Sequence, residues 1–369
     1  MKVAHTTSGV RGLASYVQNQ HNYFAAHDPE VDNLVISSAK WRKQPIKVFE
    51  PDSVLIANIL PWPKKVKQVE DKLFEYQPDI LHHHHPSGRL DFKVRRFQKK
   101  LNIPTICTVH MSVGSKKYFV DKVMHTFFKL VRGNFKRIDC YVAISQFVKR
   151  QLVEIGGVPE DKIVLLYAGV DTEIFKPIPR EKHNTLEITF VGQIMLEKGI
   201  DMLINTVTEL AKTRDVRLNI VGDGNLKAML QKKTEGQAEI NWVGYLNGQS
   251  KVAEYYAKSD VVVLPNRWDE AFSYIPLEAM ASGTAIIASN VGGNAEAIVD
   301  GVTGRLFDKN NPDELLSILR DTPMETFWNM GTNGRSHALK HFTLKHFGEK
   351  YRRLYDNLVH NPDVIEQID

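Results

Sequence analysis

The chain has 369 residues, 43% hydrophobic and 25% charged, a composition typical of a soluble globular protein long enough for two domains. Its two cysteines, Cys107 and Cys140, provide no disulfide framework and no metal-binding spacing, so we expect a reducing, cytoplasmic setting. The opening MKVAHTTSG lacks the apolar core of a secretion signal, and no uncharged run reaches the ~20 apolar residues that span a bilayer.

The net charge of +5 conceals two halves of opposite sign. Residues 1–178 hold 27 Lys and Arg against 17 Asp and Glu, whereas the rest of the chain holds 21 against 26. Residues 89–150 alone carry 15 basic and three acidic side chains. We therefore expect an anionic partner for the first half of the chain.

Strand-like and helix-like segments alternate from the N-terminus onward. In the first half, strand-like residues 2–9, 78–86, 104–111 and 140–145 are each followed by a helix-like run, the first of these runs starting at Leu13. In the second half, strand-like segments lie at residues 186–192, 217–224, 241–245, 261–265, 284–289 and 304–307. Between the first two of these, apolar residues at positions 200, 203, 204, 207 and 210 fall on one helical face.

This alternation predicts parallel sheets covered by helices on both faces. The stretch FKPIPREKHNT, residues 175–185, is rich in proline and charge and interrupts the pattern as a linker would. The sequence thus predicts an α/β protein of two doubly wound, Rossmann-like domains, residues 1–174 and 186–344, with the ligand in the cleft between them.

The segment DEAFSYIPLEAMASGTAIIAS, residues 269–289, holds the most informative chemistry. A buried strand ends just before it, and a helix is expected to start near Tyr274. Three backbone amides would then point outward from the helix start and form an anion site suited to phosphate. These amides belong to Ala271, Phe272 and Ser273.

Two glutamates bracket that anion site. Glu278, one turn into the helix, can accept two vicinal hydroxyls of a ribose, while Glu270 on the loop can accept hydroxyls of a second sugar. A similar strand-to-helix turn, FVGQIMLEKG, places Lys198 before a helix, where its charge would meet phosphate oxygens. Each residue also has a simpler explanation, Glu278 as a solvated helix-start carboxylate and Lys198 as an ordinary surface lysine.

These motifs resemble a known family. The segments FVGQIMLEKGIDMLI, VGDG, DEAFSYIPLEAMASGTAIIAS and GGNAEAIVDGVTGRLF are similar to retaining glycosyltransferases of the GT-B fold, family 4. The segments PDILHHHHPSG and IPTICTVH resemble the acceptor domain of that family, and AGVDTEIFKP resembles its interdomain linker. The resemblance covers nearly the whole chain, and the pair of glutamates followed by EAMASG is its most specific part.

The resemblance implies a role for each matching residue. Glu270 and the 271–273 amides would contact the donor sugar and diphosphate, Glu278 the ribose and Lys198 the diphosphate. Gly12 would allow the backbone to approach the donor phosphates, or would serve only the geometry of a tight turn. His110 would face the transferred sugar, or would be a buried structural histidine. Gly244 and its neighbours would border the base.

The resemblance also implies that the cleft closes on donor binding and that a C-terminal helix, residues 345–369, packs back on the first domain. Two positions depart from the family pattern. Gln193 stands where arginine is usual, and a neutral side chain cannot compensate diphosphate charge. We hypothesise that Arg11, from the opposite domain, supplies that charge. Ser273 stands where glycine is common, and its hydroxyl can cap the helix.

No cofactor or metal is required by this scheme, in which the departing phosphate takes the acceptor's proton and no protein nucleophile is needed. The histidine run His82–His85 suggests a metal site only weakly, because alternate strand residues point to opposite faces and at most two of the four can share an ion. We expect these residues at a strand end lining the cleft.

Residues 115–137 mix Lys and Arg with aromatic side chains, which fits either a membrane-surface helix or a core helix with a solvated basic face. We expect a retaining glycosyltransferase that transfers sugar from a nucleotide-diphosphate sugar, UDP being favoured, to a glycan or lipid-linked acceptor in bacterial surface polysaccharide assembly. Peripheral attachment to an anionic membrane through residues 89–150 is part of this expectation, and nucleic acid is not. The alternatives are transfer to a soluble small molecule, a nucleotide-sugar epimerase, and a binding protein without turnover.

Overall fold

The structure, a computed structural model, describes residues 1–7, 11–37, 47–49, 63–85, 93–111, 138–179, 181, 183–361 and 365, the side chains of 11–13, 47–49 and 63–65 excepted. The chain divides into two compact units. The first comprises Met1–Gly169 together with Leu344–Asp369, and the second is the continuous segment Val170–Thr343. The segment expected as a linker, residues 175–185, falls within the second unit.

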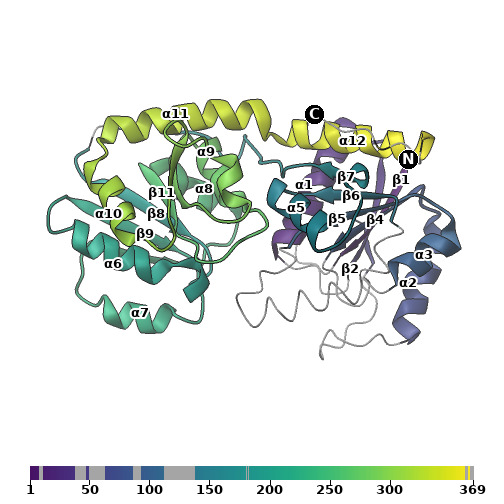
Figure 1. The fold of residues 1–369 in the computed structure, drawn as a ribbon, viewed down its shortest axis with the longest axis horizontal. Coiled ribbons are helices and arrows are strands. Elements are labelled where there is room, and N and C mark those ends of the chain that lie inside the picture. The colour runs from purple at the N-terminus through teal and green to yellow at the C-terminus, as the bar shows by residue number, and fades with distance from the viewer. Residues whose placement is uncertain are drawn as a thin grey trace. The chain divides into compact units, whose positions relative to one another are not determined.

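The first unit is built on a seven-stranded parallel sheet in the order β3-β2-β1-β4-β5-β6-β7 (Figure 1). Its strands are β1 (Lys2–Thr7), β2 (Asp32–Ser37), β3 (Lys47–Phe49), β4 (Ile80–His85), β5 (Thr105–Val109), β6 (Cys140–Ala143) and β7 (Ile163–Leu165). Its helices are α1 (Arg11–His27), α2 (Pro63–Tyr76), α3 (Val94–Leu101), α5 (Gln146–Glu154), the short η2 (Glu160–Lys162) and α12 (Leu344–His360).

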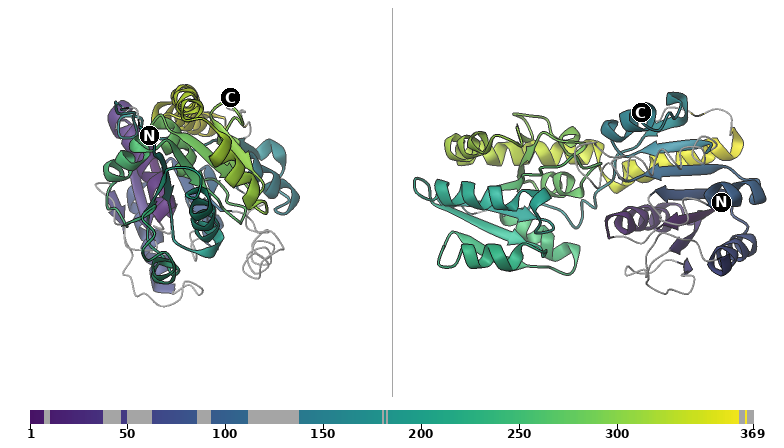
Figure 2. Two further views of the ribbon diagram at one scale, coloured as in Figure 1. Left: turned by 90° about the vertical axis from the view of Figure 1, so that its left-hand side faces the viewer. Right: turned by 60° about the horizontal axis from the view of Figure 1, so that its bottom comes forward.

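The second unit is built on a six-stranded parallel sheet in the order β10-β9-β8-β11-β12-β13. Its strands are β8 (Leu186–Val191), β9 (Val216–Val221), β10 (Ile240–Gly244), β11 (Val261–Leu264), β12 (Ala285–Ser289) and β13 (Gly304–Phe307). Its helices are η3 (Leu196–Lys198), α6 (Ile200–Leu210), α7 (Lys227–Lys233), α8 (Gln249–Lys258), α9 (Tyr274–Ala281), η4 (Asn294–Ala297), α10 (Pro312–Asp321) and α11 (Met324–His341). In both units helices flank the sheet, as the two views of Figure 2 show.

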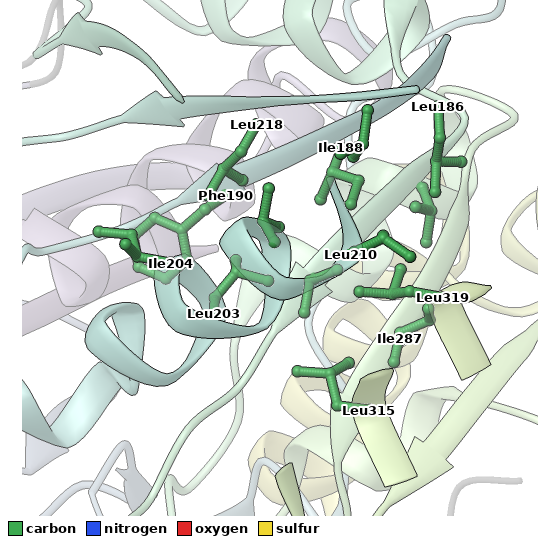
Figure 3. Packing of buried hydrophobic residues seen from close by; sticks show 14 of the residues in the cluster. Leu186, Ile188, Phe190, Leu203, Ile204, Leu210, Leu218, Ile287, Leu315 and Leu319 are labelled. Atoms are coloured by element: carbon green, nitrogen blue, oxygen red, sulfur yellow. The ribbon is translucent and has the colours of Figure 1, made fainter. Parts of the chain in front are cut away.

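The core of the second unit confirms the helical periodicity read from the sequence. Ile200, Leu203, Ile204, Val207 and Leu210 are all buried on α6. Figure 3 shows Leu186, Ile188 and Phe190 of β8 in one cluster with the buried residues of this helix, together with Leu315 and Leu319 of α10. At roughly 1.5–3 kcal/mol for each fully buried apolar side chain, this face fixes α6 far more firmly than helix propensity does.

The C-terminal helix α12 belongs to the first unit and packs on α1 (Figure 1). Gly348 permits the close contact, because a Cβ at this position would lie 1.9 Å from a ring carbon of Tyr23. The Tyr351 hydroxyl lies 2.9 Å from that of Tyr16, and the Tyr355 hydroxyl accepts a hydrogen bond of 2.6 Å from Gln20. The helix is therefore bound by both packing and buried hydrogen bonds.

In each sheet the strand order reverses at one place, between β1 and β4 in the first unit and between β8 and β11 in the second. Loops on either side of such a reversal leave a crevice at the carboxyl ends of the strands, where α/β proteins bind ligands. In the second unit the two loops are residues 192–199 and 265–273, which contain several of the residues singled out from the sequence.

Candidate active site

Close backbone contacts shape the crevice of the second unit. The loops after β8 and β9 pack directly on one another, since a Cβ on Gly222 would lie 1.8 Å from the carbonyl oxygen of Gly192. The loop after β8 likewise meets the end of β11, where a Cβ on Gly199 would lie 1.9 Å from the carbonyl oxygen of Pro265. With φ of +67°, Gly199 also adopts a conformation that disfavours any side chain.

An ion pair joins the two loops of this crevice. Lys198 Nζ, at the end of η3, contacts Oε1 of Glu270. The other carboxylate oxygen of Glu270 accepts a hydrogen bond of 3.0 Å from Nδ2 of Asn294, at the start of η4. Trp268 Nε1 lies 3.5 Å from Oε1. The structure thus brings together a lysine and a glutamate that are 72 positions apart in the sequence.

The loop that carries Glu270 is held from both sides. Arg267 donates two hydrogen bonds, each of 2.8 Å, to the carboxylate of Asp201 on α6. The backbone oxygen of Glu270 accepts a hydrogen bond of 2.8 Å from the amide of Gly293. The chain turns at Gly292 with φ of +55°, and a Cβ there would lie 2.2 Å from the Glu270 carbonyl oxygen. The position of the Glu270 carboxylate is therefore built into the fold.

Burial changes the acidity of Lys198. The side chain is 15% exposed, and desolvation lowers the pKa of its ammonium group from 10.5 to about 8. A positive charge held with so little water around it interacts strongly with an incoming anion.

Helix α9 begins where the sequence predicted. Its first residue is Tyr274, and the hydroxyl of the N-cap residue Ser273 accepts a hydrogen bond of 3.2 Å from the amide of Ile275. Glu278 lies one turn in and is half-buried. Its Oε2 accepts a hydrogen bond of 3.0 Å from the hydroxyl of Tyr256, which is completely buried on α8. The carboxylate of Glu278 is thus oriented by a hydrogen bond from a buried tyrosine and is not a freely solvated surface carboxylate.

The remaining predicted residues of the second unit lie around the same edge of the sheet. Ala271 and Phe272 belong to the loop that precedes α9. Gln193 is exposed just after β8. Gly244 ends β10 with φ of +82°, and its carbonyl oxygen accepts a hydrogen bond of 2.9 Å from the amide of Gly222. The roles given to these residues stay predictions.

Three predicted residues belong to the first unit. Arg11 and Gly12 are the first two residues of α1. His110 follows β5 directly, is half-buried, and donates its backbone amide to the carbonyl oxygen of His85 at 2.9 Å. Burial is the main cause that lowers the pKa of His110 from 6.5 to about 3, so its imidazole is neutral at physiological pH.

The histidine run lies at a strand end, as the sequence predicted, but it is not an exposed lining. All four side chains, His82–His85, are buried in β4. His82 and His84 share one face and meet His5 of β1, so that ring nitrogens of these three residues lie within 4.8 Å of one another. The contribution of His5 comes from the neighbouring strand, which the run His82–His85 by itself does not indicate. The basic, aromatic segment 115–137 lies outside the described residues.

Comparison with known proteins identifies the family. Residues 10–174 match the model described as "Glycosyltransferase Family 4", and residues 171–323 match "Glycosyl transferases group 1". The chain belongs to the group 1 glycosyltransferases. A protein named "Uncharacterized glycosyltransferase MJ1178" from Methanocaldococcus jannaschii is 29% identical over 76% of each chain. The "Uncharacterized 41.2 kDa protein in cps region" of Klebsiella pneumoniae is 28% identical over 53% of this chain and about half of its own length, 54%.

Solved structures establish the fold of this glycosyltransferase as GT-B. Anabaena Alr3699/HepE, crystallised with UDP, covers 97% of the chain with a TM-score of 0.78 at 16% identity, and all of HepE is covered. The lipopolysaccharide outer core galactosyltransferase WaaB covers 98% of the chain and 99% of its own with a TM-score of 0.72 at 18% identity. Among the described residues of the glycosyltransferase, no helix is both long enough and apolar enough to cross a bilayer.

Sequence reasoning missed three residues that complete this site in the glycosyltransferase. Asn294 fixes the second oxygen of Glu270, and Tyr256 orients Glu278. Asn266, two residues after the end of β11, is fully buried, and neither end of its side-chain amide has a hydrogen-bond partner among the described residues. Asn294 stands within the quoted segment GGNAEAIVDG, a signal that could have drawn attention to it, whereas Tyr256 lies on a helix that carries no motif.

Proposed function

We propose that this glycosyltransferase transfers a sugar from a nucleotide-diphosphate sugar, with retention of anomeric configuration, to a glycan or lipid-linked acceptor in bacterial surface polysaccharide assembly. One observation carries the donor assignment. Lys198 and Glu270, from opposite sides of the strand-order reversal, meet beside the capped start of α9. A cation and a helix N-terminus suit a diphosphate, and a fixed carboxylate suits sugar hydroxyls.

The ion pair gives this site a defined order of events. In the absence of donor, Glu270 partly satisfies the buried ammonium group of Lys198. A diphosphate carries more charge than one carboxylate and competes for the same ammonium group. Lys198 then turns to the diphosphate, and Glu270 becomes available to accept hydroxyls of the transferred sugar while Asn294 keeps it in place.

In this scheme the main contribution of the protein to the reaction is electrostatic stabilisation of the transition state. Negative charge grows on the leaving diphosphate as the sugar becomes oxocarbenium-like, and Lys198 and the α9 N-terminus are placed to stabilise that charge. The leaving phosphate takes the acceptor's proton in this scheme, so that neither a protein nucleophile nor a metal ion is needed. Glu278, held by Tyr256, takes the ribose hydroxyls at the other end of the donor.

Uracil is the favoured base. The structural relative HepE is described in complex with UDP, which supports a UDP-sugar as the donor here. A thermal-shift panel of UDP-, GDP- and ADP-sugars tests this. The cognate donor at 100 times its dissociation constant should add roughly 2.7 kcal/mol to the free energy of unfolding, whereas non-cognate donors should add little. A panel in which no nucleotide sugar raises the melting temperature would refute the donor assignment.

The acceptor assignment is supported by the basic surface of α3. Val94 and Phe97 are buried, whereas four other positions of this helix and the residue before it carry basic side chains, namely Lys93, Arg95, Arg96, Lys99 and Lys100. A groove of about 640 Å³ runs between α2 and α3 and is lined by Lys67 and three of these basic residues, with Glu70 and Asp71 as its acidic members. Such a surface attracts phosphate-bearing lipids or an acidic acceptor.

Liposome flotation separates these possibilities. With anionic vesicles at low salt the protein should float, and salt should release it, because the attraction falls off within a Debye length. Neutral vesicles serve as the control. Absence of salt-sensitive binding to anionic vesicles would exclude the membrane part of the proposal and favour a soluble acceptor. The anomeric configuration of the product, measured by NMR, decides between retention and inversion.

A further inference from the structure

A row of hydrogen bonds crosses the first sheet and ends at His110. It starts on β2, where Asn33 Oδ1 lies 2.9 Å from His5 Nε2. On β1 the other nitrogen of His5, Nδ1, lies 3.0 Å from His84 Nε2 of β4. His84 Nδ1 in turn lies 3.0 Å from His110 Nε2, directly after β5. The row thus follows the spatial order β2-β1-β4-β5, and its first three members are buried.

Asn33, the first member of the row, decides which atom is the donor in each of its hydrogen bonds. The side-chain nitrogen of Asn33 faces the carbonyl oxygen of Val31 at 3.4 Å, which leaves its oxygen toward His5. An amide oxygen only accepts, so His5 Nε2 must carry the hydrogen. A neutral imidazole has one N–H, so Nδ1 of His5 accepts and Nε2 of His84 donates to it. The same step repeated puts the hydrogen of His110 on Nε2.

The three imidazole rings of the row are neutral because they are buried. Desolvation is the main cause that lowers the pKa of His5 to about 4 and of His110 to about 3, and it lowers the pKa of His84 well below 6.5. None of the three rings therefore carries a second proton at physiological pH.

A shared metal ion explains the cluster less well. His82 lies beside the row, and its two nitrogens are already 2.7 Å from the hydroxyls of Tyr355 and Thr108. Its ring is stacked on that of His84, with centroids 4.1 Å apart and planes only 26° from parallel. A metal ion lies in the plane of each imidazole that binds it, and two nearly parallel stacked rings do not converge on one ion.

We propose that Asn33, His5 and His84 are positioning residues that hold His110 as its Nε2-protonated tautomer, leaving Nδ1 as a hydrogen-bond acceptor for a hydroxyl of the transferred sugar. The tautomer follows from the row itself, while the part concerning the sugar rests on the proposed function. A sugar hydroxyl is then recognised as a donor by His110, and a sugar that presents only an acceptor at that position is rejected.

NMR of the full-length protein labelled with ¹⁵N-histidine tests the tautomer without any ligand. His110 should show an unprotonated Nδ1 and a protonated Nε2 between pH 6 and 8, with a scalar coupling across the hydrogen bond to Nδ1 of His84. A His110 that is protonated at Nδ1, or that averages between both tautomers, would overturn the proposal even if every variant failed to fold.

The variant Asn33→Leu removes the acceptor at the far end of the row, three hydrogen bonds from His110, while roughly keeping the side-chain volume. The ¹⁵N chemical shifts of His110 should then move toward the values expected for an average of the two tautomers. In the same variant kcat should fall roughly fivefold, while the donor dissociation constant stays within about twofold. His83→Leu is the matched control, since His83 is equally buried on β4 but faces Thr6 on the other side of the sheet. It should leave the His110 spectrum unchanged.

The outcomes separate this inference from the proposed function. If the protein binds a nucleotide sugar but the His110 spectrum is the same in Asn33→Leu, the inference is overturned and the proposed function stands. The expected tautomer and its loss in Asn33→Leu, in a protein that binds no nucleotide sugar, would support the row and refute the proposed function.

Discussion

Lys198 shows how one buried side chain can set the working range of a site. The ammonium group lies against the carboxylate of Glu270, and burial brings its pKa down to about 8. An ordinary lysine, with a pKa of 10.5, would keep its charge to a pH about 2.5 units higher. The charge that this site offers to a diphosphate is therefore sensitive to mild alkalinity.

Donor affinity should consequently fall as the pH rises through about 8, because Lys198 loses its proton above that value. The dissociation constant, measured by calorimetry, should rise up to about tenfold per pH unit in this range. In Lys198→Arg the dissociation constant should not change over this pH range, since a guanidinium group does not lose its proton near pH 8. An identical alkaline rise in Lys198→Arg would show that another group is responsible.

Tyr256 acts on the donor through Glu278. The variant Tyr256→Phe keeps the ring but removes the hydrogen bond of 3.0 Å that orients the carboxylate. We expect the donor KM to rise about fivefold, corresponding to ~1 kcal/mol, with a smaller effect on kcat. Glu278→Ala should be more severe. An unchanged KM in Tyr256→Phe would mean that Glu278 binds the donor without the hydrogen bond from Tyr256.

At the scale of elements, the crevice of the second unit exists because loops approach one another without side chains between them. The turns VGQI and VGDG meet at Gly192 and Gly222, and a Cβ on Gly224 would lie 2.2 Å from the carbonyl oxygen of Ile194. The glycines thus serve close backbone packing, which places the strand ends and with them Lys198.

Gly222→Ala should therefore destabilise the second unit strongly. The added Cβ would lie 1.8 Å from a backbone oxygen, which cannot move without shifting the loop after β8. We expect a loss of more than about 3 kcal/mol in urea unfolding. Gly236→Ala is the matched control, because its φ of +84° is equally unusual but nothing lies within 4 Å of the new Cβ. That variant should lose only about 1–2 kcal/mol.

At the scale of the whole molecule, the chain builds one continuous and one discontinuous unit. The second unit begins at Val170, and Arg335 of α11 links its first residues to the end of α9. Its guanidinium group donates to the carbonyl oxygen of Phe175 at 2.8 Å and to that of Ala281, the last residue of α9, at 2.6 Å. The first unit is completed only by α12, which covers His82 and Thr108 through Tyr355 and Tyr351.

Residues 170–343 should consequently fold alone and bind UDP, because the Lys198–Glu270 crevice and its supports lie entirely within them. A cooperative thermal transition, shifted upward by UDP, is the expected result in circular dichroism. Residues 1–169 without α12 should fail to give a cooperative transition, since the face of the sheet that bears the histidines would be exposed to water. A stable fragment 1–169 would contradict this account of α12.

The role of Arg11 in donor binding stays a hypothesis drawn from the sequence. If Arg11 supplies the charge that Gln193 lacks, Arg11→Ala should weaken donor binding several-fold in the full chain and have no counterpart in fragment 170–343. The measurement is the UDP dissociation constant of both proteins, with Lys198→Ala as the positive control. Unchanged donor affinity and turnover in Arg11→Ala, beside a clear loss in Lys198→Ala, would end this hypothesis.

The sequence by itself determined the features that are local. Apolar periodicity placed α6, strand-like runs placed β8 to β13, and the helix-like run after the loop placed the start of α9 near Tyr274, because each depends on residues a few positions apart. The family followed from motifs for the same reason. Local patterns also indicated Lys198, Glu270 and Glu278 as members of one site.

Only the tertiary structure decided which side chains meet. The ion pair of Lys198 with Glu270 joins loops after two strands that no short pattern relates, and Tyr256 supports Glu278 from a helix without a motif. The row from Asn33 to His110 crosses four strands that are consecutive in the sheet and far apart in the chain. Burial, which brings the pKa of Lys198 to about 8 and keeps the histidines neutral, is a property of the assembled units, since it depends on atoms from every layer around the side chain.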